Sequence, residues 1–140
     1  MKSVHPLIVA VSPSKKITQR LNQLLKKDFG LNLKTSESGL ESLQIMEKNH
    51  PVLFILDDMV KDIKPRALCE SIRSHAHFHD MPIALISTLE NEDVVRLMFE
   101  TPRIHHLNKP LHDDEVIETV TDLLQHFVYF ERMLKRAANG

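Results

Sequence analysis

PVLFILDDM (residues 51–59) joins an unbroken apolar run to two aspartates. Residues 52–56 are apolar without alternation, which is typical of a strand that is buried on both faces of a parallel sheet. Residues 6–11 (PLIVAV) have the same pattern. We therefore expect two central parallel strands, one of which ends at the carboxylates Asp57 and Asp58.

The segments around these two runs alternate between helix and strand patterns. Ile17, Leu21 and Leu25 recur at helical spacing after the first run. Ser12 and Pro13 suit the cap and the first turn of that helix. Further strands are expected at 31–35, 81–87 and 104–107, and further helices after Gly39, from Pro65, around 94–98 and from about Asp113. Five strands alternating with five helices predict an α/β fold, a doubly wound parallel sheet with helices on both faces.

Composition and charge exclude several classes of protein. At 140 residues with 42% hydrophobic content, the chain suits one domain with its own core. Its formal net charge of −1 argues against nucleic-acid binding. The longest apolar runs fall far short of the ~20 residues of a membrane helix. A single cysteine precludes an intrachain disulfide, and the N-terminus lacks a signal-peptide pattern. We therefore expect a cytoplasmic protein without a membrane partner.

Candidate site residues follow the ends of the expected strands, because open parallel sheets bind ligands at the carboxyl ends of their strands. Only three glycines occur, so neither a dinucleotide fingerprint nor a Walker phosphate loop can be written. What remains is Asp57 after the middle strand, Ser87 after the fourth, and Lys109 with Pro110 after the fifth. No convergent acid, base and pocket signature indicates an enzyme with a small-molecule substrate.

These positions belong to three motifs that together resemble the receiver domains of bacterial response regulators. The motifs are PVLFILDDM (51–59), PIALIST (82–88) and LNKPL (107–111), and the resemblance covers roughly residues 5–126. It implies a flavodoxin-like sheet of strand order 2-1-3-4-5. It also implies a signalling module in two-component phosphorelays rather than an enzyme, with at most self-catalysed phosphoryl transfer.

The resemblance also implies a role for each site residue. Asp57 would accept a phosphoryl group from a sensor histidine kinase or a phosphotransfer protein, Ser87 would donate a hydrogen bond to it, and Lys109 would pair with its charge. A carboxylate nucleophile, a hydroxyl donor and a fixed cation suit this chemistry. His106 stands at the family's aromatic switch position and Pro110 in its Lys–Pro turn. Taken singly, these residues also suit strand-end caps or solvated loop positions.

The sequence departs from the family where a divalent metal would bind. Receivers typically end the first strand with two adjacent acids, and here Ser12 and Pro13 occupy those positions. Mg²⁺ prefers oxygen ligands that include one or two carboxylates. Asp57 and the backbone carbonyl of Met59 alone are expected to bind it weakly or not at all. An ion pair between Asp57 and Lys109 becomes plausible in the resting protein, because two like charges are missing.

Two further departures lie beside the acceptor. Val60 and Lys61 replace the Met–Pro pair that is common in the family, and Thr88 replaces a small residue, which narrows the approach of a phosphoryl group. For His106, a solvated side chain is the alternative to a switch.

Two weaker signals lie outside the motifs. His75, His77 and His79 with Asp80 could hold Zn²⁺ or Ni²⁺, but histidines at the end of a helix also complement the helix dipole. Cys69 adjoins apolar positions of an expected helix, which favours a structural thiol over a nucleophile.

Two functional hypotheses follow. The three motifs favour a phosphoacceptor, whereas the missing acids favour a pseudo-receiver that acts independently of phosphorylation as a protein-interaction and dimerisation module. In either case we expect a receiver domain over residues 1–126 and a C-terminal helical extension over residues 127–140.

The C-terminal region predicts homodimerisation, or a linker helix to an output module. Apolar residues recur there at alternating spacings of four and three, the pattern of a coiled-coil seam: Val116, Val120, Leu123, Phe127, Phe130, Leu134 and Ala137. One compact domain needs only the first half of this seam. The alternative is that the helix frays after Tyr129 and the apolar residues beyond it fold back. Sedimentation is expected to detect a dimer at tens of micromolar that Leu134→Glu or truncation after Tyr129 dissociates. A monomer unaffected by either change would contradict dimerisation through this seam.

Overall fold

The sheet has five parallel strands in the order β2-β1-β3-β4-β5. A computed structural model describes the backbone of residues 6–139 and the side chains of residues 6–125 and 136–139. The strands are β1 (Leu7–Val11), β2 (Asn32–Ser36), β3 (Leu53–Asp57), β4 (Ile83–Ser87) and β5 (Ile104–Asn108). The predicted strand order and doubly wound α/β class are therefore confirmed.

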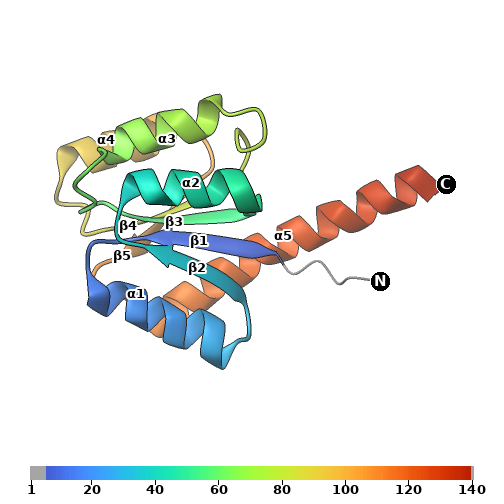
Figure 1. The fold of residues 1–140 in the computed structure, drawn as a ribbon, viewed down its shortest axis with the longest axis horizontal. Coiled ribbons are helices and arrows are strands. Elements are labelled where there is room, and N and C mark those ends of the chain that lie inside the picture. Colours follow the sequence, from blue (N-terminus) through green and yellow to red (C-terminus); the bar gives the residue numbers. More distant parts are fainter. Residues whose placement is uncertain (1–5, 140) are drawn as a thin grey trace.

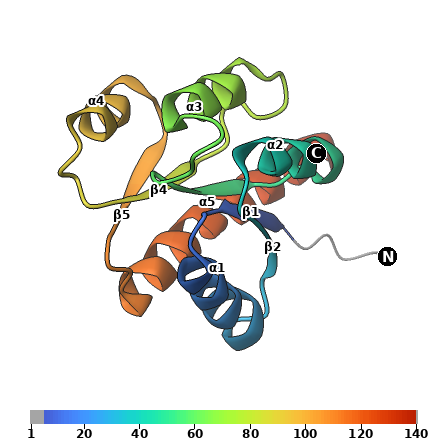
Figure 2. The same ribbon diagram turned by 60° about the vertical axis from the view of Figure 1, so that its left-hand side comes forward.

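Helices cover both faces of the sheet, as Figures 1 and 2 show. Helices α2 (Gly39–Asn49), α3 (Pro65–Ser74) and α4 (Glu92–Glu100) lie on one face, and α1 (Lys15–Leu21) with α5 (Asp113–Asn139) lies on the other. Alternate residues of each central strand pack on opposite faces. In β3, for example, Phe54 belongs to the α2–α4 side of the core and Ile55 to the α1–α5 side. Both faces are apolar, which explains the runs without alternation.

The first helix differs from the prediction at its start. Its N-cap is Ser14, whose side chain accepts a hydrogen bond from the backbone N–H of Ile17, and not Ser12. The hydroxyl of Ser12 instead donates to Asp57, and it accepts a hydrogen bond from the backbone N–H of Ser14. Pro13 also precedes the helix, which begins at Lys15. The helix continues as a π-helical segment, η1 (Asn22–Asp28), and the chain turns at Gly30 with φ +67°.

Helix α5 begins at the carboxyl edge of the sheet and runs beyond its opposite edge (Figure 1). Val116, Val120 and Leu123, the first half of the expected seam, are buried against the sheet. Phe127, Phe130 and Leu134 lie outside the residues whose side chains are described, and Ala137 is exposed. No helix in the described part of the chain is long and apolar enough to cross a membrane.

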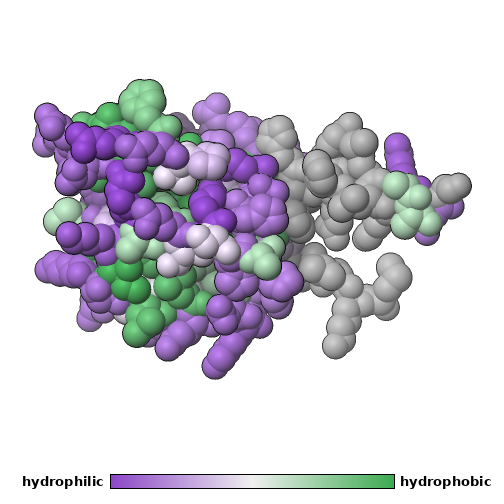
Figure 3. Space-filling view, turned by 90° about the horizontal axis from the view of Figure 1, so that it is seen from above, coloured by the Kyte–Doolittle hydropathy of each residue, from purple (hydrophilic) through white to green (hydrophobic). Residues whose placement is uncertain are grey.

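The outer surface over α2, α3 and α4 is mostly hydrophilic, with apolar patches towards the left-hand end in Figure 3. That end carries the carboxyl ends of the strands and the start of α2. Among the described side chains, the large apolar ones that stay exposed include Leu40, Met59, Leu89 and Phe99.

Phe54 tests the core on the α2–α4 side. Its side chain is fully buried, between Val9 of β1 and Ile83 of β4. Phe54→Ala is expected to lower the free energy of unfolding by about 3–5 kcal/mol, because it removes buried apolar surface and leaves a cavity. Urea unfolding measures the change. The matched control is Phe99→Ala, at a residue that is 88% exposed, for which about 0.5 kcal/mol or less is expected.

Candidate functional site

Three candidate residues meet at the carboxyl edge of the sheet. Asp57 is the last residue of β3, Ser87 is the last residue of β4, and Lys109 follows β5 directly. The strands remain in register beyond their ends, because the backbone N–H of Lys109 donates to the carbonyl of Ser87 at 3.0 Å and that of Asp58 to the carbonyl of Ile86 at 3.0 Å. Parallel pairing therefore carries all three residues to one edge.

The Asp57 carboxylate is buried and hydrogen-bonded through both oxygens. Its Oδ1 accepts from the Lys109 ammonium at 2.6 Å and from the backbone N–H of Met59 at 2.9 Å. Its Oδ2 accepts from the Ser12 hydroxyl at 2.6 Å. The expected ion pair with Lys109 is present. Ser12 contributes a hydrogen-bond donor where the family usually has an acid.

Lys109 also pairs with Asp58, which the sequence did not single out as a site residue. Its Nζ lies 2.8 Å from Oδ1 of Asp58, whose side chain is largely buried. Burial alone would lower the pKa of Lys109, but the hydrogen bonds to Asp57 and Asp58 outweigh it, so the pKa is raised. In the sequence, the presence of a second aspartate directly after Asp57 could have indicated this contact. The turn after β3 then brings both carboxylates to one lysine.

Ser87 makes its side-chain contact with His106, and not with Asp57. Nε2 of His106 lies 3.0 Å from both the hydroxyl and the carbonyl oxygen of the buried Ser87. His106 is half-buried, so the solvated alternative does not describe it. A protonated Nε2 would donate to Ser87, whereas an unprotonated Nε2 would accept from its hydroxyl.

The loop after Asp57 is anchored to the start of α2 by Asp62. Its carboxylate accepts hydrogen bonds from the backbone N–H groups of Leu40 and Gly39 and from the Ser38 hydroxyl, at 2.8–3.0 Å. These bonds, with Leu40 the largest contributor, lower the pKa of Asp62 to about 2. A Cβ at Gly39 would lie 3.3 Å from the same carboxylate, so a glycine allows this approach. Sequence reasoning missed Asp62, because its partners lie more than twenty residues away.

Two other departures from the family can be placed beside this site. Val60 is buried and Lys61 is exposed in the loop after Asp57. Thr88 is exposed, and its hydroxyl accepts from the backbone N–H of Glu90 at 3.3 Å. Pro110 follows Lys109 through a cis peptide bond.

The side chains present do not fit Mg²⁺. Ser12 is a neutral hydroxyl that already donates to Asp57, and Pro13 has no polar side chain. Asp57 is then the only expected ligand position with a carboxylate, and its Oδ1 is paired with the Lys109 ammonium. Among the described residues, no group of three or more His, Cys, Asp or Glu side chains is placed to hold a metal ion.

The histidine cluster and the cysteine have structural surroundings. His75 pairs with Glu47 at 3.3 Å through Nε2, accepts from the backbone N–H of His77 through Nδ1, and stacks on Phe78. The zinc or nickel alternative has no assembled ligand set in the described part of the chain. Burial raises the pKa of the Cys69 thiol to about 11, so it is a structural thiol and not a nucleophile.

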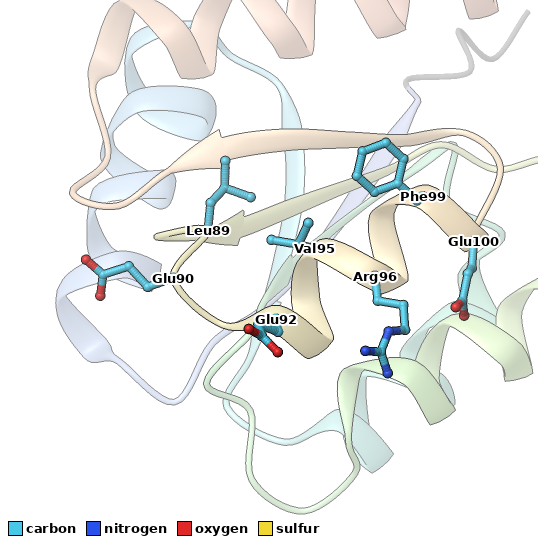
Figure 4. Close-up of a pocket in the computed structure, with 7 residues that line it drawn as sticks. All are labelled: Leu89, Glu90, Glu92, Val95, Arg96, Phe99 and Glu100. Atoms are coloured by element: carbon cyan, nitrogen blue, oxygen red, sulfur yellow. The ribbon is translucent and has the colours of Figure 1, made fainter.

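A groove of about 400 Å³ lies along α4, away from Asp57. Figure 4 shows its apolar side chains, Leu89, Val95 and Phe99, on one side, and Arg96 and Glu100 pointing away from them. Leu89 has φ +65°, a conformation that is strained for a residue with a Cβ. The remaining residues of the groove are Glu90 and Glu92. The groove shares no residue with the Asp57 network.

Comparisons with known proteins identify one family. The family model for the response regulator receiver domain matches residues 8–121. The chemotaxis response regulator CheY4 of Vibrio cholerae has a similar structure, with a TM-score of 0.77 and 19% identity over 86% of this chain and 99% of that one. The signal receiver domain of an HD domain-containing protein from Pseudomonas fluorescens Pf-5 matches with a TM-score of 0.81 and 20% identity, over 94% and 97% of the two chains.

A sequence relative is the hybrid signal transduction histidine kinase D of Dictyostelium discoideum. It is 22% identical over 125 residues. The match covers 88% of this chain but only 8% of that kinase.

Ser12 tests the hydrogen bonding of Asp57. Ser12→Ala removes the donor to Oδ2 at a buried position, and is expected to lower the free energy of unfolding by about 1–3 kcal/mol, because a buried charged acceptor loses a partner. Thermal or urea unfolding measures the loss. Ser71→Ala, at an exposed position on α3, is the matched control. Equal effects of the two substitutions would contradict a role for Ser12 in stabilising the carboxylate.

Proposed function

Since the chain belongs to the response regulator receiver family, we propose that it accepts a phosphoryl group on Asp57 in two-component signal transduction. The observation that carries the proposal is the direct contact between a carboxylate at the end of the central strand and the Lys109 ammonium, at 2.6 Å. A carboxylate oxygen is a competent nucleophile, and a fixed cation stabilises the charge that spreads over the transferred oxygens.

In this proposal each site residue has a role after transfer. Lys109 pairs with the phosphoryl charge, and the Ser87 hydroxyl donates a hydrogen bond to a phosphoryl oxygen. His106, which now contacts Ser87 at 3.0 Å, would follow Ser87 inward as the switch residue. Pro110 holds the turn that follows Lys109. Phosphorylation adds about −1.5 to −2 charges, which is the force that draws these side chains together.

The partners and the location follow from the family. The phosphoryl donor would be a sensor histidine kinase or a phosphotransfer protein, and the protein would act in the cytoplasm without binding nucleic acid through this domain. Mg²⁺ would bind at most weakly, through Asp57 and the Met59 carbonyl. Residues 127–140 would form the dimerisation or linker helix that follows a receiver domain of residues 1–126.

A second candidate is a pseudo-receiver, an interaction and dimerisation module that works without phosphorylation. The observation that favours it is that both oxygens of Asp57 already have partners in the unmodified protein. Ser12 and Pro13 in place of the acidic pair also support it.

Incubation with acetyl phosphate and Mg²⁺, followed by intact mass measurement, tests the proposal. The native chain is expected to gain the mass of one phosphoryl group, because acetyl phosphate supplies an activated phosphoryl donor. Asp57→Asn should gain none. Asp80→Asn, at an exposed aspartate before the start of β4, the end opposite Ser87, should label like the native protein. A native chain that stays unlabelled would support the second candidate.

A further inference from the structure

We propose that Lys109 supplies at Asp57 the fixed positive charge that a divalent cation would otherwise supply, so that phosphoryl transfer to Asp57 does not need Mg²⁺. This inference rests on the proposed function and specifies how the same site works. It starts from the disagreement between the family's metal site and the side chains that this chain places there.

The first argument is position. The Nζ atom of Lys109 lies 2.6 Å from Oδ1 of Asp57 and 2.8 Å from Oδ1 of Asp58. A dication at the family's position would have Asp57 as its only carboxylate, because Ser12 and Pro13 supply no acid, and its charge would lie beside the ammonium. The side chain of Lys109 is only 19% exposed and its ammonium contacts both carboxylates, so the positive charge is already in place beside the nucleophile in the unmodified protein.

The second argument is charge. Two carboxylates and one ammonium give this site a formal charge of −1. With two more acids at positions 12 and 13, the same site would carry −3 and would repel a phosphoryl donor strongly until a metal neutralised it. Ser12 and Pro13 remove those charges. The site therefore needs less positive charge for neutralisation, and the single charge of Lys109 neutralises a larger share of it.

The third argument is the supply of hydrogen-bond donors. A lysine ammonium carries three N–H groups, and the described contacts use two of them. One N–H group can therefore meet an incoming phosphoryl oxygen. The Ser12 hydroxyl, 2.6 Å from Oδ2, orients the carboxylate from the opposite side. Positioning and charge stabilisation are the main requirements of phosphoryl transfer.

The step balances without a metal or a proton shuttle. A carboxylate oxygen of Asp57 forms a new bond to phosphorus as the bond between phosphorus and the acyl oxygen of acetyl phosphate breaks. Acetate leaves with the electron pair of that bond. Lys109 keeps its proton throughout, and its charge acts on the phosphoryl oxygens.

The test is the initial rate at which acetyl phosphate labels the whole native chain, with Mg²⁺ and with EDTA, measured by intact mass. Similar rates are expected in the two conditions. A rate more than about tenfold lower in EDTA, equivalent to about 1.4 kcal/mol of activation free energy, would overturn the inference and leave the proposed function standing. Absence of label in both conditions would reject the proposed function and the inference together.

Two substitutions sharpen the result. Ser12→Asp returns one acid beside Asp57, so its labelling should slow in EDTA and recover in Mg²⁺, whereas the neutral control Ser12→Asn should label at similar rates in both. Lys109→Met should lose labelling in EDTA, because it removes the only cation that contacts Asp57 among the described residues. If Lys109→Met labelled in EDTA as fast as the native chain, the charge of Lys109 would not replace the metal.

Discussion

The structure of the site depends on one buried carboxylate at the end of the central strand, because its negative charge must be compensated by neighbouring groups. Asp57 is 1% exposed, and a buried charge is costly unless cations and hydrogen-bond donors compensate it. Three donors do so here: the Lys109 ammonium, the Ser12 hydroxyl and the backbone N–H of Met59. They come from the ends of three different segments of the chain. The carboxyl edge of the sheet is therefore organised around one charge.

The site is supported by contacts that lie outside it. Asp62 ties the loop after Asp57 to the first turn of α2, where backbone N–H groups and the helix dipole both favour a carboxylate. On the other face, Arg20 of α1 makes a two-point ion pair with Asp113 at the start of α5, at 2.6 and 2.8 Å. This exposed pair adds little stability alone. It joins the last turn of α1 to the first turn of α5 on this face of the sheet.

The replacement of two acids by Ser12 and Pro13 is easier to understand once the partners of Lys109 are known. Without those acids, Asp57 and Asp58 share one lysine, and Ser12 provides a neutral donor in place of a negative charge. The electrostatic problem of the site changes from neutralising several carboxylates to neutralising two. This change is consistent with either functional candidate, since it stabilises the resting carboxylate and also leaves a cation beside the nucleophile.

The sequence alone determined the class of fold and the positions of the site residues, because apolar runs without alternation are a local pattern and the strand ends follow from it. The strand order came from the resemblance of three motifs to the receiver family. The sequence also predicted the ion pair between Asp57 and Lys109, but only the tertiary structure decided the other contacts of the site. Ser12 was predicted as a helix cap, but its hydroxyl donates a hydrogen bond to Asp57. Asp58 shares the Lys109 ammonium with Asp57, and the Ser87 hydroxyl contacts His106. Each contact joins residues that are distant along the chain, through parallel strands and the turns after them. Local spacing carries no record of such pairs, since strand register and loop geometry arise only when the whole sheet assembles.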